Sequence, residues 1–420
     1  MTTPSWAKRA FSAFSIPNFR LWFFGQTLSV SGKWMQRIAQ SWLVLELTGS
    51  GTALGLVVAV QFLPILLFAP LGGLVADRFN NRRLIFATQV SAAVVAIILG
   101  LLVVTNTVEL WMVYVLAAAL GLIASVDTPT RQTFVLELVD RGHLKSAVSL
   151  NSVLVNLARI IGPAFAALLI ATVGLGVCFL VNGITYFGVI GALLLMDLDE
   201  LQTAPSQPRK ERQLREGLAY VRVTPTVLVP LLMMLAIGTF AFEFQVILPL
   251  FARFTFGGDA TTYATMTSFM GAGAMVGGLV TASRRSRPPV ALAKVAALFG
   301  LVHLALAFAP TLTMAYAAIT LLGGVAVGFI TLGNTTVQLA AAPEMRGRVM
   351  GLWVVAFLGS TPVGGPVIGW IGEHLGPRVG IGVGAIATLI TAAVAYRILD
   401  RFEMAPDEEA RRLGPSAKLG

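Results

Sequence analysis

Runs of about 20 apolar residues recur along the whole chain, separated by short polar breaks. A run of that length spans a bilayer as an α-helix, whereas a membrane β-strand needs only about 10 residues of alternating character. Hydrophobic residues make up 56% of the sequence and charged residues 12%, which excludes a water-facing soluble domain. We predict an all-α membrane protein with twelve transmembrane helices, at 21–46, 53–75, 84–105, 110–127, 147–172, 177–196, 227–250, 261–282, 290–309, 312–333, 347–371 and 379–398.

The basic residues indicate which side of the membrane each loop faces. With a cytoplasmic N-terminus, 23 of the 30 Lys and Arg residues fall in cytoplasmic segments and five within spans, and only Arg253 and Arg378 lie outside. The positive-inside rule therefore places both termini in the cytoplasm, with the protein in the inner or plasma membrane. Anionic lipid headgroups account for the net charge of +10, so no nucleic acid partner is expected.

A polar stretch near the midpoint divides the spans into two sets of six. Short motifs recur between the halves at similar offsets, because Gly-Gly-Leu-Val occurs at 72–75 and 277–280, and Gly-Pro at 162–163 and 365–366. This pattern predicts two pseudo-symmetric six-helix bundles related as parallel repeats. The predicted parts are an N-terminal bundle (1–196), a cytoplasmic linker (197–226), a C-terminal bundle (227–398) and a cytoplasmic tail (399–420).

The segment after the second span reads Gly73-Leu-Val-Ala-Asp77-Arg78-Phe-Asn80-Asn81-Arg82-Arg83. It resembles the signature loop of the major facilitator superfamily, Gly-x-x-x-Asp-Arg-x-Gly-Arg-Arg, with two asparagines in place of the second glycine and the first arginine of the pair. The resemblance implies a cytoplasmic gate in which Asp77 meets the start of the eleventh span near Arg346. A basic stop that only orients the helix is the alternative, but it leaves Asp77 unexplained. The implied gate residues are Gly73, Asp77, Arg78, Arg82 and Arg83.

Two further stretches narrow this resemblance. Residues 32–50 (GKWMQRIAQSWLVLELTGS) and 127–134 (DTPTRQTF) are similar to the enterobactin-exporter branch of the superfamily, which is of the transmembrane secretion effector type and also contains macrolide exporters. The resemblance covers nearly the whole chain. It implies a secondary active exporter in which two six-helix bundles rock against each other and a small amphipathic, siderophore- or drug-like molecule leaves in exchange for protons.

The fifth span carries Gly162 and Pro163 within a stretch similar to the antiporter motif Gly-x-x-x-Gly-Pro-x-x-Gly. Gly-Pro bends a helix and small neighbours allow close packing, which suits a seam between bundles that must seal against proton leak. Gly365 and Pro366 form the related pair in span eleven. A kinked packing helix with no bearing on transport is the alternative.

A stripe of polar residues runs along the first span. On a helix of 3.6 residues per turn its members share one face, which cannot contact lipid. A basic residue at the centre of a span costs about 3 kcal/mol on insertion scales, so Lys33 and Arg37 require a counter-charge or water. We expect this face to line a hydrated substrate cavity, and its positive charge to attract an acidic or phenolic substrate. The stripe consists of Gln26, Ser29, Lys33, Gln36, Arg37 and Gln40.

Glu243 is the deepest acid and lies in span seven, the repeat partner of span one. The repeat offset places Glu243 within a turn of Arg37 in depth, so we expect the two side chains to face each other across the cavity. Glu243 would then be a proton-coupling residue, and a permanent ion pair between the bundles is the alternative. Arg159 in span five has Asp127, at the cytoplasmic end of span four, as its expected partner, and both are further coupling candidates.

Several other functions are unsupported by the sequence. It contains no phosphate-binding Gly-x-x-x-x-Gly-Lys loop, and its three histidines are too scattered for a metal site. We therefore expect no enzyme, no metal and no cofactor, and a monomer whose partners are a small molecule, protons and membrane lipids. Two rivals remain open: a lipid or lysophospholipid flippase of the same fold, and a non-transporting membrane sensor.

Overall fold

The computed structural model describes residues 11–202, 213–282 and 289–412, and every regular element within these ranges is a helix. The all-α prediction is confirmed. The first set comprises η1 (Ser12–Ser15), α2 (Pro17–Thr48), α3 (Gly51–Arg78), α4 (Asn81–Val104), α5 (Leu110–Glu137), α6 (Leu144–Val173) and α7 (Leu175–Leu195). The second comprises α8 (Gln213–Val223), α9 (Pro225–Ala241), α10 (Phe244–Leu250), η2 (Phe251–Thr255), α11 (Ala260–Ala282), α12 (Val290–Ala307), α13 (Leu312–Ala340), α14 (Arg346–His374) and α15 (Pro377–Arg412).

Eleven segments of the described chain have the length and mean hydropathy of a membrane span. One of them is the stretch Pro225–Thr255, which α9, α10 and η2 form together. The twelfth span is α2, a helix of 32 residues that packs against α6 and α7. Its mean hydropathy is lowered by the polar stripe, and the twelve predicted spans are all present as helices.

Most helix limits differ by a few residues from the sequence-based expectation, and two differences matter for function. α5 continues past Pro129 to Glu137 instead of ending at 127, so Asp127 and Arg131 lie inside a helix. Span seven is not continuous, because Phe242 and Glu243 interrupt it between α9 and α10. Towards the chain's end, α15 extends to Arg412. Of the predicted linker, residues 203–212 lie outside the described ranges, and so do residues 413–420 of the predicted tail.

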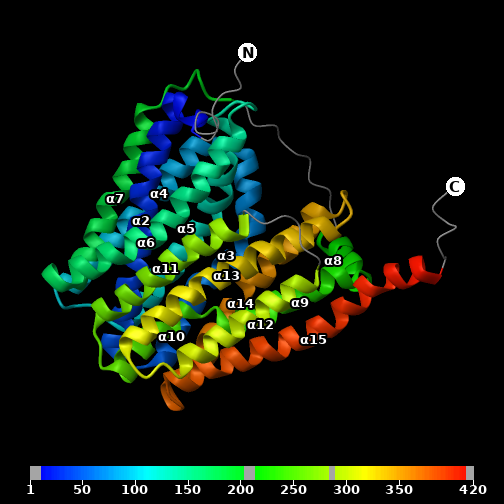
Figure 1. Cartoon of the computed structure of the whole chain (residues 1–420). Coiled ribbons are helices and arrows are strands. Elements are labelled where there is room, and N and C mark those ends of the chain that lie inside the picture. The colour runs from blue at the N-terminus through cyan, green and yellow to red at the C-terminus, as the bar shows by residue number, and fades with distance from the viewer. Residues whose placement is uncertain (1–10, 203–212, 283–288, 413–420) are drawn as a thin grey trace.

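The helices before and after the midpoint form two groups that meet at one end and diverge towards the end where both chain termini lie (Figure 1). We call the diverging end the terminal face and the other end the opposite face. The contacts between the groups run mainly along α3 with α14 and α6 with α11. The helix axes of the two groups therefore lie farther apart at the terminal face than at the opposite face.

Glycines allow the close approach of α3 and α14 at the opposite face. A Cβ on Gly55 would collide with the carbonyl group of Gly365, and one on Gly369 would collide with that of Gly51. At the same end Glu373 Oε2 accepts hydrogen bonds from the Thr52 backbone N–H (2.9 Å) and hydroxyl (2.6 Å). This end of the molecule is therefore sealed by backbone contact and by hydrogen bonds across the two groups.

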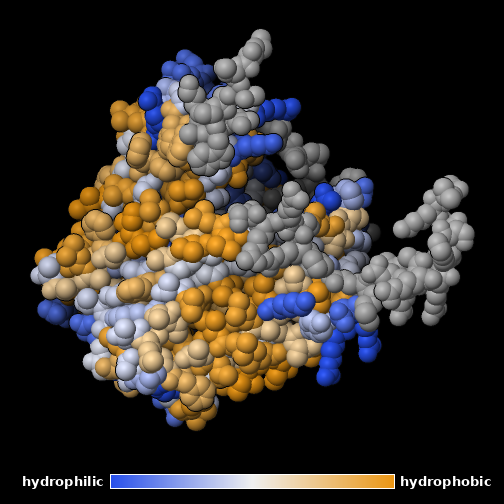
Figure 2. All heavy atoms as spheres, in the orientation of Figure 1, coloured by the Kyte–Doolittle hydropathy of each residue, from blue (hydrophilic) through white to orange (hydrophobic). Residues whose placement is uncertain are grey.

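On the face seen in Figure 2, apolar side chains cover large areas of both groups and hydrophilic ones gather near the helix ends. Large apolar side chains such as Phe24, Leu195 and Leu279 are exposed on the protein surface, at 66%, 74% and 68% exposure. In water such a surface would aggregate, whereas hydrocarbon solvates it without penalty. The chain is a multi-pass membrane protein.

Candidate functional site: a charged centre within the membrane

Asp127 of α5 forms the centre of a buried polar network. Its Oδ2 atom lies 3.2 Å from Lys33 Nζ of α2 and 2.6 Å from Arg131 Nε, one turn further along α5. Its Oδ1 atom accepts hydrogen bonds from the Thr88 hydroxyl (2.8 Å) and the Gln89 amide (3.0 Å), both on α4. One carboxylate therefore joins three helices and meets two positive charges.

A cavity of about 90 Å³ adjoins this network and is lined largely by polar side chains. Of the predicted stripe, Lys33, Gln36, Arg37 and Gln40 line it. Gln26 and Ser29 are buried in helix packing and do not line it, and Ser29 donates a hydrogen bond to the Gln89 side chain (3.3 Å). The other lining residues are Gln61, Gln89, Ala92, Leu120, Ile123, Ala124, Asp127 and Tyr186.

The expected partnership of Lys33 and Arg37 with Glu243 is wrong. Lys33 pairs with Asp127 instead, because α5 continues beyond residue 127 and carries this carboxylate at membrane depth. The expected pairing of Arg159 with Asp127 is wrong for the same reason, since Lys33 and Arg131 occupy the Asp127 carboxylate. Arg131 lies beyond the predicted end of span four at residue 127, and the spacing of four residues between Asp127 and Arg131 is the sequence signal for their pairing on one helix.

Arg37 and Arg159 share an aromatic partner. The Trp34 ring centroid lies 4.8 Å from Arg37 Cζ and 5.5 Å from Arg159 Cζ. Gly162 makes this arrangement possible, because a Cβ there would lie 2.5 Å from Trp34 Cβ. The cluster therefore joins α2 to α6 through two guanidinium groups and one indole.

Glu243 lies at the interruption between α9 and α10 and is 3% exposed. It faces α14, where the Thr361 hydroxyl donates a hydrogen bond to its carboxylate. A Cβ on Gly364 would lie 2.9 Å from Glu243 Oε1, and that oxygen has no hydrogen-bond partner among the described residues. Glu243 therefore lies next to the contact between α14 and α3 and outside the polar cavity.

The predicted gate residues gather at the terminal face, where α3 ends and α4 begins. Arg82 Nε donates a hydrogen bond to the Leu193 carbonyl of α7 (2.8 Å), while Asp77, Arg78 and Arg83 are exposed and Gly73 is buried. The two residues that depart from the family pattern have structural roles. Asn80 caps α4 by accepting from the Arg83 N–H (3.1 Å), and the Asn81 amide donates to Glu137 (2.6 Å).

The two Gly-Pro motifs take part in different helix contacts, one between the two groups of helices and one within the N-terminal group. Gly365, followed by Pro366, lies between the two groups of helices against Gly55. Gly162, followed by Pro163, instead packs against α2 within the N-terminal group, so its expected place in the seam is wrong. The corresponding close contact between groups is made by Gly271 of α11, where a Cβ would lie 2.6 Å from the Arg159 carbonyl oxygen.

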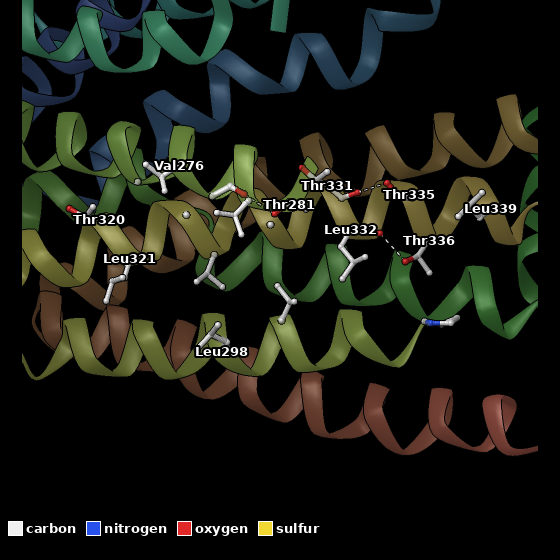
Figure 3. A pocket seen from close by; sticks show the side chains of 18 of the residues that line it. Val276, Thr281, Leu298, Thr320, Leu321, Thr331, Leu332, Thr335, Thr336 and Leu339 are labelled. Atoms are coloured by element: carbon white, nitrogen blue, oxygen red, sulfur yellow. Dashed lines mark hydrogen bonds between the residues drawn. The ribbon is translucent and has the colours of Figure 1, made fainter. Parts of the chain in front are cut away.

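A larger cavity, of about 1040 Å³, lies between α11, α12 and α13 (Figure 3). Its wall includes Val276, Leu298 and Leu321, which are 58%, 48% and 62% exposed on the protein surface. Thr331 and Thr335 follow α13 along it, and the Thr335 hydroxyl donates back to the Thr331 carbonyl (2.9 Å). This groove opens on the protein surface and shares no lining residue with the polar cavity.

The geometry agrees with comparisons against known proteins. The family model described as "Transmembrane secretion effector" matches residues 8–417. The chain belongs to this family of the major facilitator superfamily. Proteins of this family are membrane transporters, so the chain is a transport protein.

Relatives of this transport protein include exporters that differ in cargo. The multidrug efflux pump Tap of Mycobacterium tuberculosis is 26% identical over 417 residues, which cover 94% of this chain and 97% of the relative. The enterobactin exporter EntS of Shigella boydii is 23% identical over 422 residues, or 97% and 99% of the two chains. The staphyloferrin A transporter of Staphylococcus aureus is 27% identical over 266 residues, or 62% and 66%.

Solved structures share the fold of this transporter. A bacterial homologue of the human lysosomal transporter Spinster, in an inward-facing and unoccupied conformation, gives a TM-score of 0.71 at 14% identity and covers 92% of this chain and 98% of that one. The nucleoside transporter NupG gives 0.70 at 13% identity, with 93% and 99% covered. The predicted major facilitator fold is confirmed.

Proposed function

We propose that this protein exports a small amphipathic, siderophore- or drug-like molecule across the inner or plasma membrane in exchange for protons. The observation that carries the proposal is the buried carboxylate of Asp127 between Lys33 and Arg131, beside a polar cavity at membrane depth. Ionisable groups inside spans are costly and mark ion or substrate pathways. Two relatives are named as a multidrug efflux pump and an enterobactin exporter, and these names support the same function.

We base alternating access on the difference between the two ends of the molecule, because the two groups of helices diverge at one end and are in contact at the other. We place the terminal face in the cytoplasm, because the basic residues obey the positive-inside rule with both termini inside. The diverging helices then admit substrate from the cytoplasm, while the Thr52–Glu373 contacts close the outer end. We assign residues 1–196 and 227–398 to the two bundles that rock, as a monomer, with Asp77 and its neighbours as the inner gate.

Proton exchange needs a carboxylate whose protonation changes the charge balance of the cavity. Lys33 and Arg131 keep Asp127 ionised, so it takes up a proton only after the Lys33 ammonium group leaves it to meet substrate. Glu243 is a second coupling site, because it lies against α14 at the closed end. In this exchange we assign Arg159 to binding of the substrate, not of the proton.

The test is gradient-driven transport in everted membrane vesicles. An acidic lumen should drive accumulation of a fluorescent efflux dye, and nigericin should release it. Asp127→Asn should abolish accumulation, whereas Asp199→Asn, at an exposed turn, should leave it unchanged. Full accumulation by the Asp127→Asn variant, or accumulation insensitive to nigericin, would count against proton exchange at this site.

The groove between α11, α12 and α13 favours one second candidate, a lipid or lysophospholipid flippase. Its apolar wall suits an acyl chain, and Lys33 and Arg37 would bind the phosphate headgroup. Lipid scrambling and dye efflux, measured in the same vesicles, separate the two functions. Scrambling without efflux would favour the flippase.

A further inference from the structure

The Arg37–Trp34–Arg159 cluster carries two positive charges without a counter-ion. Among the described residues neither guanidinium group forms an ion pair. The neighbouring acid, Asp127, is already bound by Lys33 and Arg131. In addition, Arg159 Nε is buried and has no hydrogen-bond partner in the described part of the chain.

Packing alone does not account for this arrangement. A cation over an indole ring is attracted to it, but two like charges that share one ring repel each other. Among the described residues no anion offsets this repulsion, and a bound anion would supply the missing charge.

We infer that Arg37, Trp34 and Arg159 form the binding site for a carboxylate group of the exported compound, with an adjacent ring or apolar segment lying on the Trp34 indole. Guanidinium groups bind carboxylates through paired, charge-assisted hydrogen bonds. Arg37 also lines the polar cavity, so the bound compound extends from the cluster towards Lys33 and Tyr186. The inference rests on the proposed export function and narrows its substrate class to organic acids.

The site is tested by equilibrium binding, without any proton gradient. The wild-type protein in nanodiscs of neutral lipid is titrated by calorimetry with naphthalene carboxylate and with naphthalene carboxamide, which differ in charge but share the ring. We expect the carboxylate to bind at least about tenfold more tightly, because a charge-assisted contact contributes about 1.5–3 kcal/mol. Arg37→Gln and Arg159→Gln should each remove this preference. Arg397→Gln, at an exposed position on α15, is the matched control and should keep it.

A second measurement needs no ligand. If the two charges are uncompensated, Arg159→Gln should leave the melting temperature of the empty protein unchanged or raise it, whereas a structural role of the Arg–Trp stack predicts a lower value. Equal binding of the two naphthalene compounds, or equal loss in the Arg397→Gln control, would overturn the inference. So would a lower melting temperature of Arg159→Gln.

These outcomes are distinct from failure of the export proposal. If the protein exports a neutral dye under a pH gradient but shows no preference for the carboxylate, only the binding site is wrong. If it prefers the carboxylate and no gradient drives efflux, the binding site stands and proton-coupled export is wrong.

Discussion

Lys33 of α2 lies 3.2 Å from Asp127 of α5, so the charge of this lysine is balanced inside the N-terminal group of helices. The side chain of Lys33 is 32% exposed and that of Asp127 only 7%. Both side chains line the polar cavity, but the lysine is the more accessible of the two. This difference makes Asp127 the member of the pair on which the arrangement of α2, α4 and α5 depends.

Removing the acid should destabilise the protein more than removing the lysine. Asp127→Asn leaves Lys33 and Arg131 as two partly buried cations without this anion, and we expect it to cost about 3 kcal/mol of folding stability. Lys33→Met leaves the Asp127–Arg131 pair intact and should cost less. Thermal unfolding of the purified variants measures both, and the reverse order would show that Lys33 holds the network.

The glycine contact between α3 and α14 should control closure of the opposite face. Gly369→Ala places a methyl group against the Gly51 carbonyl, so the two helices must separate. Gly351→Ala on the same helix meets open space and is the matched control. Spin labels at Leu47 and Leu375, both exposed near this end, should report a longer distance in Gly369→Ala alone. Equal distances in both variants would mean that the seal does not depend on this approach.

Glu243→Gln should separate proton coupling from packing. The amide has the size of the carboxyl group and can keep the contact with Thr361, so we expect a change in stability below about 1 kcal/mol. Gradient-driven dye accumulation in vesicles should fall, since a glutamine cannot carry the proton. Glu344→Gln, at an exposed site, is the control. Unimpaired accumulation would remove Glu243 from the proton pathway.

Asp77→Asn should slow turnover while leaving membrane insertion intact. The residue is exposed at the terminal face, so its loss removes little packing, whereas the resemblance of its loop implies a gating contact. Dye accumulation per inserted molecule is the measurement, with quantitative immunoblotting of the membranes as the insertion control. Asp140→Asn, exposed at the same face, should behave as the wild type, and normal transport by Asp77→Asn would discard the gate assignment.

The sequence predicted the parts of the fold that depend on burial in hydrocarbon. Each apolar run corresponds to a helix, because a lipid-exposed backbone must satisfy its hydrogen bonds internally. For the same reason the sequence predicts that the stripe containing Lys33 and Arg37 avoids lipid, and in the structure both residues line the polar cavity. These predictions rest on local composition and helical period, which the chain carries within about 20 residues.

The residues that pair across different helices could be identified only from the tertiary structure. The repeat offset placed Glu243 near Arg37 in depth, but the break after Ala241 directs Glu243 towards α14. The apolar run predicts that span four ends at Asp127, but α5 continues through Pro129, and Asp127 pairs with Lys33.

A helical, twelve-span transporter with a charged first span is predictable from residue order alone, because apolar length and polar period act locally. Which acid meets which base, and which glycines bring backbones together, became clear from the packed helices. Those choices depend on helix rotation, helix interruption and crossing, and a shift of a single residue in a helix turns its side chain by about 100°.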